Sequence, residues 1–207
     1  KLVRAISGGE DDGEREIITV AEGETVTRAE WRQAVIDWEV YEGGALSPRI
    51  QFSYDDVNHA DWEEVTESFS GLGAGEHTLA WEFQTDGSVT YDNGPMVDEI
   101  DMGAAAGAGL TPDFELDELE DFGITPVTES GITWGMTTGG YDGNAAISNY
   151  VNDGIGYIER KFEGDTLDLT FKWYTNTEEC CDFTAFFIDD KLVRAISGGE
   201  DDGEREI

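Results

Sequence analysis

The same seventeen residues stand at both ends of this 207-residue chain. Residues 1–17 read KLVRAISGGEDDGEREI, and residues 191–207 repeat them without a change. An identical copy at an offset of 190 residues predicts a gene that repeats with this period, so that the chain covers one period and a 17-residue overlap. A repeat array cut at an arbitrary place would give the same pattern. In both cases the parent protein is repetitive, and the opening on a lysine suggests a start inside a longer polypeptide or a mature fragment.

A linker-like segment indicates how the repeating domain is divided. Residues 103–109 read GAAAGAG, the one low-complexity stretch of small residues, and Thr111-Pro112 follows shortly after. We therefore expect residues 1–102 to be the C-terminal half of one repeat domain and residues 110–207 to be the N-terminal half.

The duplicate leaves two ways of completing this domain. The halves can fold together within one chain, as in a circular permutant, or residues 110–207 of one chain can be completed by residues 1–102 of the next. In the second case one copy of the 17-mer is displaced or lent as a strand, and head-to-tail completion of this kind produces a filament. The apolar residues expected to make this assembly contact are Leu2, Val3, Ala5, Ile6, Leu192, Val193, Ala195 and Ile196.

Alternation of apolar and polar residues dominates the sequence and predicts β-strands. Residues 167–173 (LDLTFKW), 77–83 (HTLAWEF) and 50–54 alternate in this way. Residues 183–190 run directly into residues 191–198, which predicts two strands joined by a tight turn. Clusters of Gly, Asn and Asp separate the runs. The pattern is typical of an all-β fold, an antiparallel β-sandwich of the jelly-roll kind.

One short helix is expected in this β-rich chain. Thr27 and Glu30 fit a capping box ahead of Trp31, so a turn or two of helix is predicted over residues 27–35. Residues 36–41 alternate again and predict a strand directly after the helix.

Charge excludes several classes of partner. The chain has 47 Asp and Glu against 12 Lys and Arg, a formal net charge of −35. A surface this negative repels nucleic acids and anionic membranes, and no apolar run of 18 residues is present that would insert into a membrane. Because 39% of the residues are hydrophobic, the chain still has enough apolar surface for a folded core.

Taken in the permuted order, the motifs resemble a known kind of module. The order is Phe114-Glu115, LDLTFKW (167–173), CCDFTAFFIDD (180–190), ISG (196–198), DWEEV (61–65), GEHTLAWEF (75–83) and VDEI (97–100). It is similar to the concanavalin-like, MAM-like jelly-roll modules of bacterial secreted and surface tandem-repeat proteins. The resemblance implies a jelly-roll fold and a secreted or cell-surface location. It fails between Gly8 and Asp61, where about fifty extra residues replace a short turn, and we expect a specialised contact there.

Catalytic motifs are lacking, so we expect no enzyme. The two histidines are His59, in an acidic loop, and His77, which we expect to be a packed, hydrogen-bonded strand residue. No G-x-S-x-G, H-E-x-x-H or phosphate-binding glycine loop occurs. Among 47 acidic residues any two carboxylates can be paired, so a glycosidase pair carries no signal.

Calcium is the cofactor that the sequence favours, because it takes six to eight oxygen ligands from carboxylates and loop carbonyls. The candidate ligands in acidic loops are Asp55, Asp56, Asn58, Asp61, Asp142 and Asn144. The resemblance implies a structural calcium near Glu115 and Asp98. A solvated acidic surface explains each of these loops equally well.

Cys180 and Cys181 are adjacent and are the only cysteines. Neighbours on a strand point to opposite faces, so the plain expectation is one buried free thiol and a second cysteine of uncertain redox state. An oxidised pair is the alternative for an extracellular protein.

Trp62, Trp134 and Tyr141 are candidates for an exposed platform on which sugar rings stack, although such side chains more often fill a core or an interface. Two functions follow from the sequence. The first is an extracellular structural or adhesive repeat unit that assembles head-to-tail with copies of itself, by strand complementation between neighbouring units. The alternative is a carbohydrate-binding module of a secreted protein, with glycans as partners.

Overall fold

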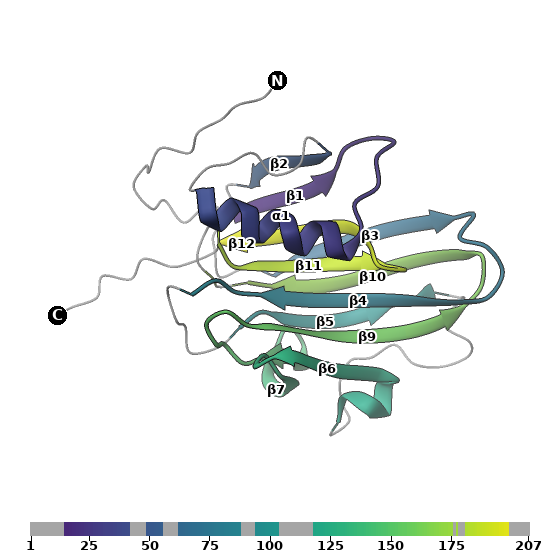
Figure 1. The fold of residues 1–207 in the computed structure, drawn as a ribbon. Coiled ribbons are helices and arrows are strands. Elements are labelled where there is room, and N and C mark those ends of the chain that lie inside the picture. Colours follow the sequence, from purple (N-terminus) through teal and green to yellow (C-terminus); the bar gives the residue numbers. More distant parts are fainter. Residues whose placement is uncertain are drawn as a thin grey trace.

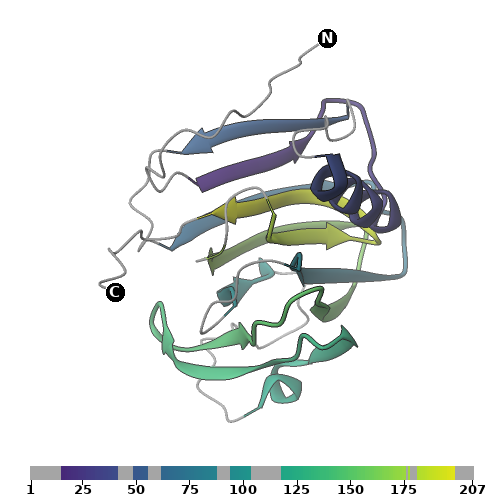
Figure 2. The same ribbon diagram turned by 60° about the vertical axis from the view of Figure 1, so that its left-hand side comes forward.

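The computed structural model describes residues 15–41, 49–55, 62–87, 94–103, 118–175, 177 and 181–198. Within these ranges, strands form two antiparallel sheets that face each other, and one α-helix lies outside the larger sheet (Figures 1 and 2). The predicted all-β sandwich with a short helix in an insertion is confirmed.

The larger sheet has seven strands in the order β2-β1-β12-β11-β4-β9-β6, and the smaller has five in the order β3-β10-β5-β8-β7. The strands of the larger sheet are β1 (Arg15–Val20), β2 (Ile50–Asp55), β4 (Glu76–Gln84), β6 (Ile124–Ser130), β9 (Ile155–Glu163), β11 (Phe183–Ile188) and β12 (Lys191–Gly198). Those of the smaller sheet are β3 (Glu63–Ser70), β5 (Met96–Asp101), β7 (Trp134–Gly140), β8 (Gly143–Ser148) and β10 (Thr166–Tyr174). A short 3-10 helix, η2 (Leu119–Phe122), precedes β6.

Both sheets contain strands from both halves of the sequence, and in each sheet a strand of the first half lies between two strands of the second. β4, from the first half, lies between β11 and β9 of the second half and pairs with both. β5 lies between β10 and β8 in the same way. The described strands of residues 1–102 and 110–207 therefore build one sandwich within a single chain. Of the predicted linker, only Gly103 belongs to the described residues.

The main core lies between the two sheets. Trp81 of β4, Phe171 of β10 and Phe186 of β11 are fully buried there, with ring centroids 5.0–5.4 Å apart. Full burial of a large apolar side chain stabilises a fold by about 1.5–3 kcal/mol. The alternation of β10 places Trp173 in this core and Lys172 on the opposite, outer face.

A second apolar cluster lies on the other face of the seven-stranded sheet, beneath the helix. β11 reads FTAFFI without alternation because it is covered on both faces: Phe186 packs in the main core, whereas Phe183 and Phe187 pack under the helix. Trp31 of the helix meets the Phe183 ring edge-on at a centroid distance of 5.4 Å. The fold thus has three layers, a helix and two sheets.

The helix, α1 (Arg28–Tyr41), begins where the sequence predicts and runs further. The Glu30 N–H donates to Thr27 Oγ1 at 3.3 Å, and the Thr27 N–H donates to Glu30 Oε2 at 2.8 Å, which is the predicted capping box. The prediction of a strand over residues 36–41 was wrong, because these residues continue the helix. Trp31 and Val35, four residues apart, bury one helix face, and a short alternating run does not exclude a helix.

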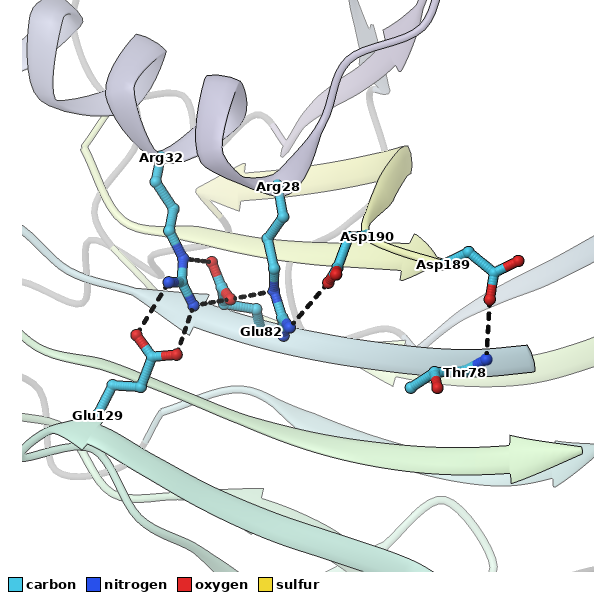
Figure 3. Close-up of polar contacts among 7 residues, drawn as sticks. All are labelled: Arg28, Arg32, Thr78, Glu82, Glu129, Asp189 and Asp190. Atoms are coloured by element: carbon cyan, nitrogen blue, oxygen red, sulfur yellow. Dashed lines mark hydrogen bonds and ion pairs between the residues drawn. The ribbon is translucent and has the colours of Figure 1, made fainter. Parts of the chain in front are cut away.

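α1 makes polar contacts with the seven-stranded sheet. Figure 3 shows Arg28 and Arg32 reaching from α1 to Glu82 of β4. Arg28 Nε lies 2.7 Å from Glu82 Oε2, Arg32 Nη2 lies 2.6 Å from the same oxygen, and Arg32 Nε lies 2.9 Å from Oε1. The Glu82 side chain is fully buried, so these two cations offset the cost of desolvating its carboxylate. Arg32 also pairs with Glu129 of β6 at 2.9 Å.

Candidate functional site

The two strand-forming parts of the repeated 17-mer pair with each other. β12 belongs to the C-terminal copy, and the first three residues of β1 are the last three of the N-terminal copy. The strands are antiparallel, with Arg15 opposite Gly198, Ile17 opposite Ile196 and Thr19 opposite Arg194. Two segments at opposite ends of the chain therefore lie side by side in the seven-stranded sheet.

The pairing has the register of a hairpin that the 17-mer itself encodes. Gly198 is the counterpart of Gly8, which precedes Arg15 by seven residues. A strand in the β12 position would therefore connect to β1 through the six residues GEDDGE, numbers 9–14 in one copy and 199–204 in the other. Gly and Asp are frequent in such turns. The sequence of the 17-mer and the register of β12 against β1 are therefore both those of a single hairpin with a six-residue connection.

β12 is a central strand buried on both faces. Ile196 is fully buried in the main core, whereas Leu192 and Ala195 belong to the cluster under α1. β11 pairs with it on one side and β1 on the other, so both of its backbone edges are used. The predicted assembly residues of the C-terminal copy thus lie in the interior of this sheet, with Val193 partly buried. Their counterparts Leu2, Val3, Ala5 and Ile6 lie outside the described residues.

A tight turn connects β11 to β12, as predicted. Its two residues, Asp189 and Asp190, have φ values of 48° and 58°, the left-handed values of a type I′ hairpin turn. Asp189 is held by its neighbours on β4: its Oδ1 accepts the Thr78 N–H at 3.0 Å, and its Oδ2 lies 2.7 Å from His77 Nδ1. His77 Nε2 lies 3.0 Å from the Gly73 carbonyl oxygen.

Both nitrogens of the His77 ring thus face an acceptor. A neutral imidazole donates from one nitrogen only, so the protonated ring fits this site best. The Gly73 carbonyl and the Asp189 carboxylate raise the pKa of His77 above its ordinary value of 6.5. His77 is the packed, hydrogen-bonded strand residue that the sequence predicted, and its role is to hold the β11–β12 turn against β4.

A second candidate site is an aromatic surface at one end of the five-stranded sheet. Trp62 and Tyr141, both predicted, come together here: their ring centroids lie 6.2 Å apart. Tyr174 of β10 joins them at 5.8 Å from Trp62. Tyr141 exposes 53% of its surface, and Trp62 and Tyr174 are partly exposed. Trp134, in contrast, packs in the main core and exposes 6%, so it is not part of this surface.

Charged side chains flank the three rings. Lys172 Nζ lies 4.0 Å from the centroid of the Tyr141 ring and 2.7 Å from Glu99 Oε2. The hydrogen bond to Glu99 raises the pKa of Lys172, so its ammonium group stays charged over the neutral range. Glu99 has a φ of 48°, a left-handed value that is uncommon for a residue with a side chain and often marks functional sites. Lys172, Tyr174 and Glu99 were missed as site residues, although the alternation of residues 167–173 already put Lys172 on the outer face.

Asp98 lies beside this surface, with its carboxylate turned toward backbone. Its Oδ1 accepts the Glu99 N–H at 2.7 Å, and its Oδ2 accepts the Tyr141 N–H at 2.8 Å. Burial raises the pKa of Asp98, and these hydrogen bonds oppose the rise. The carboxylate therefore holds the β7–β8 turn that presents Tyr141.

In the part of the chain that the structure describes, no group of three His, Cys, Asp or Glu side chains is placed to bind a metal ion. Glu115, Asp56, Asn58 and Asp61, like His59, lie outside the described residues, and for Asp55 only the backbone is described.

Cys181 forms a disulfide, and no described cysteine is free, which differs from the plain expectation of a buried thiol. Cys180, the only other cysteine in the sequence, lies outside the described residues. The next residue, Asp182, is fully buried and accepts the Tyr150 hydroxyl and, at 3.1 Å, the Asp86 N–H.

Comparisons of the chain with protein-family models, curated proteins and solved structures gave no match. In the described residues, no helix has the length and apolar character needed to cross a membrane.

Proposed function

We propose that the chain is an extracellular structural and adhesive repeat unit that assembles head-to-tail into a tandem array or fibre. The observation that carries this proposal is the pairing of β12 with β1 in the register of a hairpin within the repeated 17-mer. In a continuous array with a period of 190 residues, residues 191–198 would connect through six residues to the β1 strand of the next period. One β12 strand would then pair with β11 on one side and with the β1 strand of the next period on the other.

Each sandwich of such an array would be closed across the 17-mer and joined to the next through the Gly- and Ala-rich segment of residues 103–109. Solenoid and repeat proteins gain mechanical length in this way, by adding units in series. We propose that the repeat unit is similar to the concanavalin-like, MAM-like jelly-roll modules of secreted tandem-repeat proteins. The two-sheet architecture supports this assignment, and the disulfide at Cys181 supports an oxidising, extracellular location.

The test is a chain of two whole units in series, each running from residue 110 to residue 207 and then from residue 18 to residue 102, joined by the segment of residues 103–109. We expect small-angle scattering to give a maximum dimension about twice that of the present chain, with two particles in series by electron microscopy. The temperature of unfolding should stay close to that of the single unit. A compact single particle, or a polypeptide whose second period does not fold, would contradict the proposal.

Binding of carbohydrate is a second candidate function, favoured by the exposed aromatic surface of Trp62, Tyr141 and Tyr174. The flat faces of such rings stack on pyranose sugars, and the neighbouring Lys172 and Glu99 supply hydrogen-bond donors and acceptors for sugar hydroxyls. Glycan-array binding that is lost in Tyr141→Ala and kept in Ile36→Ala would support it. Ile36 is the matched control, because it is also an exposed apolar residue but lies on α1. Equal binding by both variants, or none by the parent chain, would exclude this surface.

A further inference from the structure

The β12 position is a site for one strand in a chain that carries that strand twice. The strand is Lys191–Gly198, and residues 1–8 repeat its sequence without a change. Every side-chain contact that β12 makes is therefore available to residues 1–8 as well. Ile6 corresponds to the fully buried Ile196, and Leu2 to the buried Leu192.

Each copy reaches this position by a short connection of its own. The C-terminal copy enters from β11, through the two-residue turn Asp189-Asp190. The N-terminal copy is joined to β1 by the six residues 9–14, and it would enter from that side with Gly8 opposite Arg15. Both neighbours of β12 are antiparallel to it, so the strand has the same direction by either route.

We propose that the position between β11 and β1 is a strand-acceptor site, and that residues 1–8 of the same chain are its second occupant. The inference goes beyond the proposed array, since it needs only the duplicate and the register. The two-residue turn and its contact with His77 favour the C-terminal copy, which the structure shows in place. Loss of that copy from the site would be compensated by the other one, because the connection through residues 9–14 is short and keeps the strand close at hand.

The compensation gives a defined experiment with three variants of the full chain. Ile196→Asp places a carboxylate in the main core when the C-terminal copy occupies the site, and Ile6→Asp does the same for the N-terminal copy. We expect Ile6→Asp to unfold at the urea concentration of the parent chain. Ile196→Asp should stay folded and monomeric with a modestly lower midpoint. The double variant should lose cooperative unfolding, an effect far larger than the two single effects combined.

Hydrogen exchange identifies the occupant directly. In Ile196→Asp, the amides of residues 2–8 should exchange about 100-fold more slowly than in the parent chain, because they have entered a central strand. Residues 191–198 should lose their protection at the same time. If Ile196→Asp is as unstable as the double variant, residues 1–8 do not enter the site. If it folds only as an oligomer, the occupant comes from a second molecule and the proposal for the same chain is overturned.

Discussion

Arg15 and Gly198 face each other across two antiparallel strands, although 183 positions separate them in the chain. Within the 17-mer the corresponding residues are close in sequence, because Gly8, the counterpart of Gly198, precedes Arg15 by only seven residues. The sheet therefore pairs two segments that the repeat itself places next to each other. This relationship is the observation on which the proposed 190-residue repeat unit rests.

Removal of the Glu82 carboxylate should destabilise the fold more than removal of any exposed acid. Glu82→Ala leaves Arg28 and Arg32 without their shared partner beneath α1, so we expect a loss of about 3 kcal/mol in the free energy of unfolding. Glu129→Ala is the matched control, because that carboxylate also pairs with Arg32 but is 39% exposed. It should cost less than about 1 kcal/mol. Urea denaturation measures both, and equal losses would contradict the assigned role of Glu82.

The stability of the fold should depend on pH through His77. A folded-state pKa above 6.5 means that the protonated ring stabilises the fold. This contribution is complete below pH 6.5 and is lost as the pH rises through the folded-state pKa. We therefore expect the urea midpoint of the parent chain to fall between pH 6 and pH 9.

His77→Gln is the control for this pH dependence, since glutamine can hydrogen-bond to Asp189 but does not titrate. All other titratable groups are common to the two proteins, so the difference between the two pH profiles isolates His77. Identical profiles would show that the ring is not protonated in the fold.

The alternation of the sequence was enough to predict the strands that face the core. β4, β10 and the β11–β12 hairpin lie where the pattern places them, because each buries one face against the opposite sheet. The other face of β11 and β12 is covered by α1. The pattern failed for residues 36–41, which alternate over too short a run to distinguish a strand from the end of a helix. In this segment the capping box at Thr27 and the burial of Trp31 and Val35 stabilise the helix over a strand.

The aromatic surface could be predicted only in part. Trp62 and Tyr141 were recognised by type, but their contact depends on how the β7–β8 turn lies over the end of β10, which no local pattern encodes. Trp134 is an aromatic residue of the same kind, but its side chain packs in the main core. The sequence could not show that β1 pairs with the far copy of the 17-mer, since two identical strands compete for one place.

The net charge of −35 should make the stability depend on salt. Raising NaCl from about 0.01 M to about 0.15 M shortens the screening length from ~30 Å to ~8 Å and weakens the repulsion among the carboxylates. The urea midpoint should therefore rise. Calcium chloride at the same ionic strength tests the proposed calcium separately: a further rise that chelator reverses would support a bound ion. A midpoint that does not respond to NaCl would contradict the role given to repulsion.

The most direct test of the β12–β1 hairpin is a permuted chain with a single copy of the 17-mer. This chain runs from residue 110 to residue 207 and then from residue 18 to residue 102. The chain would join β12 to β1 covalently through residues 199–204, which removes the cost of bringing these strands together from distant positions. We expect cooperative unfolding at a urea midpoint equal to or above that of the present chain, with slow amide exchange in both strands. A permuted chain that fails to fold, or that unfolds at a clearly lower midpoint, would contradict the claim that the repeat encodes this hairpin.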